Sequence, residues 1–383
     1  MFRFSSLPPL SLYVHLPWCV RKCPYCDFNS HALRDELPQN EYVAALLRDL
    51  EHDLPRVWGR TVHSVFLGGG TPSLFDPEHI DRLLSGIRAR LPLAPLAEIT
   101  LEANPGTAEL ERFRAFREAG VNRLSIGIQS FDDAKLSALG RIHGSTEALK
   151  AARAARDAGF DNFNLDLMFG LPGQTLSQAL SDINTAIGAA PTHLSVYQLT
   201  IEPNTRFASN PPANLPGDDT LWDMQQAIQR LLAASGYHQY EVSAYAQPGR
   251  ECSHNLNYWR FGDYLGIGAG AHAKLTDPSG IARQWKQKHP AAYLAAAGTK
   301  DAIGGESRLT RNQAVGEFMM NALRLTTGFD KSLFDERTGL PIGQIVSQLE
   351  IAQSRGLIEE DVVHLRPTSL GQRYLNDLVP LFL

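Results

Sequence analysis

Residues 12–26 read LYVHLPWCVRKCPYC and join a short apolar run to three closely spaced cysteines. The run at residues 12–15 has the length and composition of a buried strand. Cys19, Cys23 and Cys26 follow it at once, separated by three and then two residues. In parallel α/β folds the carboxyl ends of the strands form the active site. The stretch therefore predicts a functional site directly after the first strand.

The strand–helix pattern continues through the first two-thirds of the chain. Candidate strands lie at residues 12–15, 64–67, 98–101, 123–127, 161–167 and 193–198, and amphipathic helices at 78–91, 109–119, 146–158 and 176–189. Buried strands that alternate with helices pair in parallel through right-handed crossovers. The pattern predicts an α/β fold of six such units. It leaves a partial (β/α)6 barrel and an open doubly wound sheet as alternatives.

The rest of the chain divides into smaller parts. A proline-rich loop at 202–219 precedes a helix at 221–235, and an aromatic, glycine-rich stretch covers 237–272. Residues 275–305 mix charge, glycine and proline and are interpreted as a connector. From residue 308 the pattern is helical and ends in a two-stranded wing at 356–358 and 362–365. We predict an α/β unit at 1–235, a completing segment with connector at 236–305, and a small C-terminal helical/winged domain at 306–383.

Composition narrows the class of protein. The chain has 383 residues, 43% hydrophobic and 20% charged, which is typical of a globular protein. A net charge of −5 argues against a nucleic-acid partner. No apolar run approaches the length of a membrane span, and the start lacks the pattern of a secretory signal. We therefore expect a cytoplasmic protein.

The cysteine spacing suits metal chemistry better than disulfides in a reducing compartment. Thiolates are soft ligands that suit iron–sulfur clusters, and three of them on a four-iron cluster leave one iron open to an external molecule. A zinc ion would need a fourth ligand, which His15 or Asp27 could supply, so zinc stays as an alternative. Cys252 stands alone and is interpreted as an ordinary free thiol.

The spacing, with Tyr25 just before the third cysteine, resembles the signature of the radical S-adenosylmethionine (SAM) superfamily. The resemblance implies a [4Fe–4S] cluster whose open iron binds S-adenosyl-L-methionine, and an electron from the cluster that cleaves it. It also implies a partial (β/α)6, TIM-like barrel. Residues 68–72, GGGTP, resemble the glycine motif that contacts the cofactor's amino group, with Gly70-Thr71 in place of its charged residue.

Further stretches resemble the coproporphyrinogen dehydrogenase (HemN) branch of that superfamily: YVHLPWC at 13–19, QSF at 129–131, GRIH at 140–143 and DLMFGLP at 166–172. By this resemblance Tyr13, Gly69 and Glu102 contact the cluster-bound cofactor. A second S-adenosylmethionine would contact six residues: Tyr25, Gly70, Thr71, Gln129, Arg141 and Asp166. Carboxylates suit ribose hydroxyls and arginine suits a carboxylate. The structural alternatives are a helix cap for Asp166 and a surface ion pair for Arg141.

Two departures argue against the dehydrogenase activity itself. The dehydrogenase has a fourth cysteine two residues after the third, where this chain has Phe28. The dehydrogenase also has a long extension before the cysteines, whereas only 18 residues precede Cys19 here.

Two other stretches, CDFNS at 26–30 and HNLNYW at 254–259, resemble the HemW family of haem chaperones in the same branch. That resemblance implies haem binding by residues 254–259, with His254 as the candidate axial ligand and Tyr258 and Trp259 as candidates to stack on the porphyrin. The structural alternative for His254 is a hydrogen-bonded histidine among aromatic residues. His272 is a second candidate, for which the resemblance favours a cofactor contact.

The resulting functional hypothesis is a haem chaperone with a SAM-binding cluster. It would take haem from a donor and deliver it to apo-proteins, with respiratory membrane enzymes as the expected acceptors. The alternatives are oxygen-independent coproporphyrinogen III dehydrogenation and a zinc-stabilised binding protein. A homodimer and peripheral membrane contact stay open. The basic cluster of Arg283, Lys286, Lys288 and His289 is interpreted as a solvated face.

Overall fold

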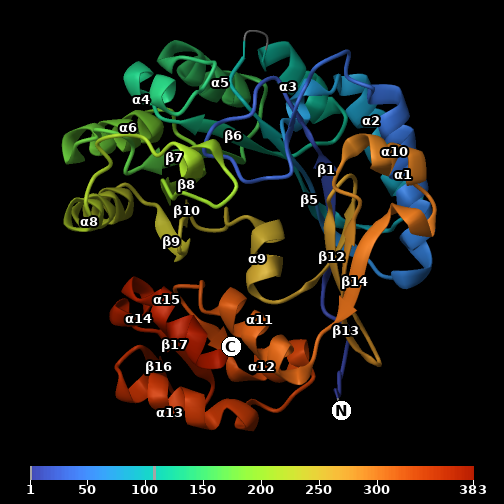
Figure 1. Cartoon of the computed structure of the whole chain (residues 1–383), viewed down its shortest axis with the longest axis vertical. Coiled ribbons are helices and arrows are strands. Elements are labelled where there is room, and N and C mark those ends of the chain that lie inside the picture. Colours follow the sequence, from blue (N-terminus) through green and yellow to red (C-terminus); the bar gives the residue numbers. More distant parts are fainter. Residues whose placement is uncertain (1, 107–108) are drawn as a thin grey trace.

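The computed structural model describes residues 2–106 and 109–383, and its central feature is a curved 12-stranded sheet (Figure 1). Neighbouring strands follow the order β14-β13-β12-β11-β1-β4-β5-β6-β7-β8-β10-β9. Six of them pair in parallel along the chain: β1 (Leu10–Leu16), β4 (Val62–Gly69), β5 (Leu93–Ala103), β6 (Arg123–Gln129), β7 (Phe163–Phe169) and β8 (His193–Gln198). The sheet curves without closing. The predicted partial (β/α)6 barrel is confirmed, and the doubly wound alternative is not.

Helices cover the outer face of this sheet in Figure 1. They pack through apolar stripes at helical spacing, as in the buried Ala148, Ala151, Ala152 and Ala155 of one helix. The helices predicted from the sequence pattern begin and end within a few residues of the observed ones. The observed helices are α1 (Gln39–Asp53), α2 (Pro77–Arg88), α3 (Glu109–Glu118), α4 (Asp133–Ala138), α5 (Ser145–Asp157), α6 (Leu176–Gly188), α7 (Arg206–Ser209) and α8 (Asp218–Ala234), of which α1, α4 and α7 were not predicted.

Additional strands extend the parallel sheet at both of its edges. On one side β11 (Asp263–Ile267) pairs in parallel with β1, and β12 (His272–Asp277), β13 (Gly280–Lys286) and β14 (Ile303–Arg308) add antiparallel strands, with α10 (Pro290–Ala296) between the last two. On the other side β10 (Ala244–Ala246) pairs with β8 and then β9 (His238–Glu241). Residues 275–305, predicted as a connector, contain β13 and α10 together with parts of β12 and β14.

The basic residues of this region were interpreted as solvent-exposed, and the structure places two of them against carboxylates instead. Lys286 is only 1% exposed, and its ammonium lies 2.6 Å from Asp49 and 2.7 Å from Asp53. Arg283 pairs with Glu317 of the C-terminal domain. A buried charge needs a partner, and these partners come from distant parts of the chain. The four basic residues thus form no common solvated face; Lys288 and His289 are the exposed ones.

The C-terminal residues form a separate core beneath the barrel (Figure 1). The helices are α11 (Arg311–Ala322), α12 (Lys331–Thr338), α13 (Val346–Ser354), α14 (Ser369–Arg373) and α15 (Leu375–Leu378). The predicted wing is present, and a third strand joins it in the order β15 (Phe329–Asp330), β17 (His364–Pro367), β16 (Ile358–Glu360). In this core the Phe318 ring contacts the rings of Phe329 and Phe334 edge to face, with centroids 5.1 Å apart in each pair.

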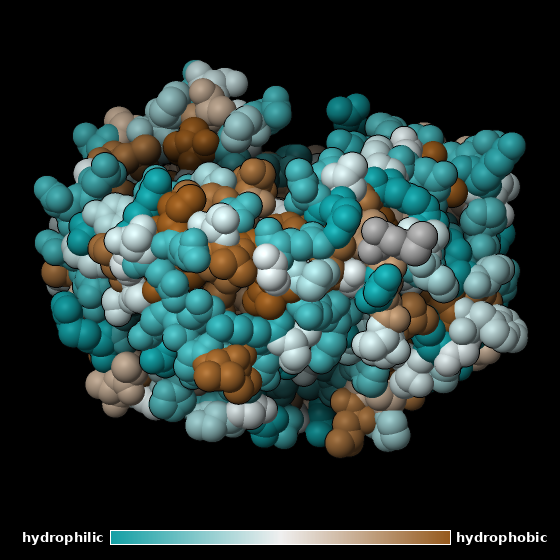
Figure 2. Space-filling view, turned by 90° about the horizontal axis from the view of Figure 1, so that it is seen from below, coloured by the Kyte–Doolittle hydropathy of each residue, from teal (hydrophilic) through white to brown (hydrophobic). Residues whose placement is uncertain are grey.

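Figure 2 looks at the molecule from the side of the C-terminal domain. Hydrophilic side chains cover most of this face, and hydrophobic ones gather in smaller groups between them. Among the helices that the structure describes, none has the length and apolar character needed to cross a membrane.

Candidate functional site

The three cysteines lie on one loop at the carboxyl end of β1. Two short parallel strands, β2 (Trp18–Cys19) and β3 (His31–Ala32), close the base of this loop. The Cys26 amide donates to the Cys23 carbonyl at 3.2 Å, so the last two cysteines share a tight turn. The Gly70 and Thr71 amides donate to the carbonyls of Leu16 and Trp18, each at 2.8 Å. The loop is thereby tied to the glycine turn after β4.

The thiols offer a donor set suited to an iron–sulfur cluster. All three are half-buried free thiols, and Arg141 donates to the Cys23 sulfur at 3.6 Å. Within the described residues, no three His, Cys, Asp or Glu side chains converge as ligands of a single metal ion. On a four-iron cluster each thiolate binds a different iron, so wider spacing is required. His15, the suggested zinc ligand, instead bonds through its ring nitrogens to Tyr13 and to the Asn29 carbonyl.

The glycine turn lets the backbone approach this loop closely. Gly69 has φ of 119°, and a Cβ there would lie 2.5 Å from the His15 ring. A Cβ on Gly70 would lie 2.5 Å from the Trp18 carbonyl oxygen. The Gly69 amide then donates to Glu102 Oε2 at 3.0 Å. Glycine is therefore required at Gly69 by conformation and by space, and at Gly70 by space alone.

Inside the barrel a cavity of about 520 Å³ extends from the cysteine loop, at the carboxyl end of β1, to Arg123 at the start of β6. Its size falls in the range of small-molecule sites. Its lining contains most of the predicted site residues: Tyr13, Cys23, Tyr25, Cys26, Gly69, Gly70, Glu102, Gln129, Arg141, Asp166 and His254. Thr71 lines a smaller neighbouring pocket and accepts a hydrogen bond from Asn104, which lines both. Cys19 lies beside the cavity on the same loop and does not line it.

Two carboxylates project into the middle of the cavity. Burial raises the pKa of Glu102 to about 7, although the Gly69 amide opposes the shift. Burial also raises the pKa of Asp166, which accepts hydrogen bonds from Ser125 at 3.1 Å and Asn164 at 2.8 Å. Asp166 is on β7 and caps no helix. The protonated forms of both acids are stabilised until a ligand or cation enters.

Arg141 sits at the mouth with both terminal nitrogens of its guanidinium in use, whereas its Nε has no hydrogen-bond partner among the described residues. It donates to the Gly127 carbonyl at 2.7 Å, to Asn104 and to the Cys23 sulfur. The alternative of a surface ion pair is therefore wrong. Gln129, at the end of β6, has φ of 72°, an unusual value for a side chain other than glycine.

The floor of the cavity is formed by α9 (Ser253–Trp259), which carries the HNLNYW stretch. His254 is 1% exposed; its Nδ1 lies 2.9 Å from Ser64 Oγ, and its Nε2 has no hydrogen-bond partner among the described residues. Its ring packs against Phe66 and Tyr258, with centroids 5.1 Å away in each case. Burial, followed by the positive charge of Arg123, lowers the pKa of His254 to about 3. His254 is therefore neutral at physiological pH.

The other aromatic and histidine candidates are placed differently. Tyr258 lines the cavity, whereas Trp259 lies under the Arg324 guanidinium, 4.3 Å from its ring centroid. His272 is exposed, lies outside the cavity lining and stacks on Trp285. Of these candidates for contact with a ligand, only Tyr258 reaches the cavity.

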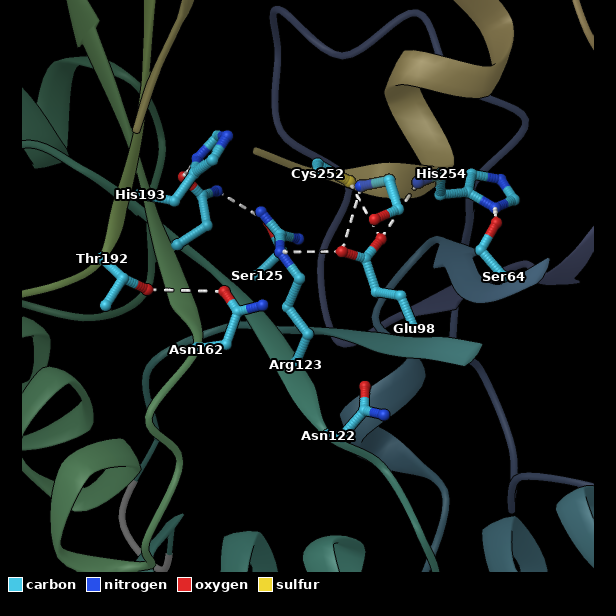
Figure 3. A network of polar contacts seen from close by, with 12 residues as sticks. Ser64, Glu98, Asn122, Arg123, Ser125, Asn162, Thr192, His193, Cys252 and His254 are labelled. Atoms are coloured by element: carbon cyan, nitrogen blue, oxygen red, sulfur yellow. Dashed lines mark hydrogen bonds and ion pairs between the residues drawn. The ribbon is translucent and has the colours of Figure 1, made fainter. Parts of the chain in front are cut away.

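Glu98 on β5 organises the floor (Figure 3). Its carboxylate accepts the amide hydrogens of Ser253 at 3.1 Å and His254 at 3.0 Å and contacts the Cys252 sulfur at 3.4 Å. The same carboxylate lies 3.9 Å from Arg123 Nε. Cys252 is a free thiol, as predicted, and burial raises its pKa to about 12. Glu98 therefore fixes the start of α9 and faces the cation of β6.

Several residues of the cavity lining were not predicted from the sequence, notably Arg123, Ser125, Asn164 and Ser195. A signal for them exists in the printed sequence. Polar or small residues alternate with Leu, Ile and Val over residues 123–129, 164–167 and 193–197. Period-two alternation within a strand marks one face as polar, in this case the face toward the barrel interior.

Three half-buried thiols beside a glycine turn, at the mouth of a partial barrel, define a radical SAM protein. The Radical SAM superfamily model matches residues 13–186, and the HemN C-terminal domain model matches residues 309–374. The chain is 52% identical over 379 residues to "Heme chaperone HemW" of Escherichia coli (strain K12) and 35% identical over 378 residues to that of Bacillus subtilis (strain 168). These matches cover 97–99% of this chain and 99% of each relative. The chain belongs to the HemW family.

The fold comparison agrees with this assignment. The solved structure of the radical SAM enzyme coproporphyrinogen III oxidase (HemN) from Escherichia coli superposes with a TM-score of 0.83. The match covers 98% of this chain and 90% of that chain at 25% sequence identity. The barrel and the C-terminal domain are thus both shared with that enzyme.

Proposed function

We propose that this protein is a haem-binding chaperone that also carries a SAM-coordinating [4Fe–4S] cluster. The observation that carries the proposal is that one cavity is lined by Cys23 and Cys26 at one end and by His254 at the other, whose Nε2 has no partner among the described residues. The relatives named heme chaperones support the haem component. The superfamily match supports the cluster.

The cluster would be held by Cys19, Cys23 and Cys26. When bound, it would supply a low-potential electron to S-adenosylmethionine at its open iron. Tyr13, Gly69 and Glu102 would contact the cluster-bound cofactor, with Glu102 accepting from hydroxyl groups. A second S-adenosylmethionine would meet the set Tyr25, Gly70, Thr71, Gln129, Arg141 and Asp166.

His254 would ligate the haem iron through Nε2. A metal ligand must be a neutral imidazole, and the low pKa of His254 keeps it neutral. The contact from Nδ1 to Ser64 fixes the ring orientation, as hydrogen-bonded partners of ligating histidines generally do. Tyr258 packs beside the ring and presents an aromatic surface to the cavity. Trp259 is held by Arg324 and is not part of this proposal.

Haem titration tests the ligand. We expect a defined Soret band in the wild type and its loss in His254→Ala, with recovery on addition of free imidazole, which can enter the space that the side chain leaves. His272→Ala is the matched control, because His272 lies outside the cavity lining. An unchanged spectrum in His254→Ala would remove the ligand assignment, and failure of imidazole to restore the band would point to a folding defect.

Anaerobic reconstitution tests the cluster. We expect about four irons per chain in the wild type, and loss of the cluster when any of Cys19, Cys23 or Cys26 is changed to serine. Cys252→Ser provides the control, because Cys252 lies at the floor beside Glu98. Stoichiometric zinc in folded, iron-free protein would contradict the cluster and favour the zinc alternative.

We further propose that haem passes from a donor to apo-proteins in the cytoplasm, with respiratory membrane enzymes as the acceptors. Haem-loaded protein mixed with an apo-acceptor should lose its Soret band as the acceptor's band appears. Incubation of the reconstituted protein with coproporphyrinogen III should leave this substrate unchanged. Conversion of two propionates to vinyl groups would instead establish the dehydrogenase function.

A further inference from the structure

We propose that Arg123 binds a propionate carboxylate of the porphyrin whose iron His254 ligates. The inference rests on the proposed haem-binding function and adds to it the group that recognises the edge of the ligand. It is drawn from a buried cation that faces the cavity and has no acceptor for its hydrogen bonds.

Arg123 opens β6 and lies at the floor of the cavity. Its side chain is 2% exposed, and its Nε has no hydrogen-bond partner among the described residues. The nearest charge is Glu98, at 3.9 Å from Nε, a distance too long for a hydrogen bond. The oxygens of Glu98 already accept from the amides of Ser253 and His254. The donors of Arg123 are thus free to meet a ligand.

Arg141 provides the contrast within the same cavity. Arg123 and Arg141 are the two arginines in the described lining, and lysine is absent from that lining. Both arginines have an Nε without a hydrogen-bond partner among the described residues, but the terminal nitrogens of Arg141 donate to the Gly127 carbonyl, to Asn104 and to Cys23. A carboxylate entering the cavity would have to displace those contacts at the mouth, whereas Arg123 offers its planar fork without such a loss.

The position of Arg123 relative to His254 suits an iron porphyrin. Figure 3 shows the two side chains on either side of Glu98, which pairs with one and accepts the backbone amide of the other. An iron porphyrin presents a metal at its centre and carboxylates at its edge. His254 can bind the metal, and Arg123, on an adjoining element, can bind a carboxylate at the edge of the same ligand.

The test compares two ligands before any mutation is made. We expect the wild type to bind haem about ten- to a hundredfold more tightly than haem dimethyl ester, which keeps the iron but neutralises both carboxylates. Arg123→Met should bind both ligands with similar affinity. Arg123→Lys, which keeps the charge opposite Glu98, should retain part of the preference. Arg88→Met is the matched control, because Arg88 bonds the Ala119 carbonyl outside the cavity lining.

The outcomes separate this inference from the function on which it rests. Equal affinity of the wild type for haem and its diester, with the His254-dependent Soret band intact, would overturn the role of Arg123 and leave haem binding standing. A preference that persists in Arg123→Met would also overturn it. Absence of haem binding by the wild type would reject the proposed function itself.

Discussion

Glu102 shows how the barrel interior changes a single residue. Its carboxyl group lies in the cavity, 3.0 Å from the Gly69 amide, and shares the space with Asp166. Burial raises its pKa from an ordinary 4.5 to about 7. A carboxyl group with this pKa changes charge near neutral pH, at the position proposed to meet a cofactor.

This shift predicts a pH dependence of stability. Between pH 4.5 and 7 the folded protein holds a proton on Glu102 that the unfolded chain has released, so the free energy of unfolding should fall as pH rises through this window. The fall should be at most about 3 kcal/mol and level off above pH 7. Urea unfolding of wild type and Glu102→Gln at pH 5 and pH 8 measures it, and the Gln variant should lose this part of the slope.

Glu111→Gln serves as the control for that measurement. Glu111 is exposed and pairs with Arg114 within one helix, so its replacement should leave the difference between pH 5 and pH 8 as in the wild type. An identical pH slope in wild type and Glu102→Gln would show that Glu102 titrates normally in the folded protein.

At this scale the sequence predicted the residues that belong to motifs. Cys23, Gly69 and Glu102 could be found because the cysteine spacing, the glycine turn and the strand end are local patterns. Arg123 and Asn164 belong to no such motif: alternation along β6 and β7 marks the face on which they lie as polar, but it gives no role to a single residue on that face. The donors of Arg123 are free because Glu98 accepts hydrogen bonds from α9, and Glu98 and α9 are both distant from Arg123 in the sequence.

Helix α9 is held by a charge at each end. Glu98 accepts hydrogen bonds from its first amides, and Arg324, just after α11, covers Trp259 at its last residue. Arg324 also donates to Glu241 at 2.9 Å. A seven-residue helix is too short to be stable alone, so these contacts determine where His254 lies.

Removing the charge of Glu98 should therefore destabilise the barrel. Glu98→Gln leaves the buried Arg123 without a counter-charge and weakens the cap of α9, and we expect a loss of about 3 kcal/mol in the free energy of unfolding. Urea titration followed by circular dichroism measures the change. Glu359→Gln, at an exposed pair with Arg366, should stay within about 0.5 kcal/mol of the wild type. A shift of similar size in both variants would mean that Arg123 needs no partner.

The contact between Arg324 and Trp259, at the C-terminal end of α9, predicts a local effect on that end of the helix. Arg324→Met removes the cation over Trp259 and the bond to Glu241, together worth about 1.5 kcal/mol. Hydrogen exchange at the amides of Arg260 and Phe261, which close the last turn of α9, should become about tenfold faster. Arg308→Met, at an exposed pair with Asp277, should leave these amides unchanged. Unchanged exchange in Arg324→Met would show that the helix end is fixed by packing alone.

Most elements could be predicted from periodicity, whereas the edge strands could not. The parallel strands and their helices follow local hydrophobic patterns, and the wing is marked by turn residues. Strands β12 and β13 contain Lys274 and Lys286, which sequence alone assigns to solvent. Their partners Asp263, Asp49 and Asp53 are known only once the chain has folded.

At the scale of the whole molecule, one cavity is lined by residues assigned to haem and by residues assigned to both S-adenosylmethionine molecules. Tyr13 and Glu102, assigned to S-adenosylmethionine, and His254 and Tyr258, assigned to haem, line the same cavity. The rings of Tyr13 and His254 are only 6.4 Å apart between centroids. A volume of about 520 Å³ is in the range that holds one ligand of moderate size. The two ligands therefore compete for room unless the barrel opens.

This competition predicts negative coupling. Saturating S-adenosylmethionine should raise the apparent Kd for haem about tenfold in the reconstituted protein, and saturating haem should raise the Kd for S-adenosylmethionine by the same factor, because coupling between binding sites is reciprocal. Anaerobic haem titrations with and without S-adenosylmethionine measure the first factor, and the reverse titration measures the second. Asp166→Asn, which keeps the shape of the lining, serves to test how far the coupling depends on its charge. Equal haem affinity with and without S-adenosylmethionine would show that the cavity expands to hold both.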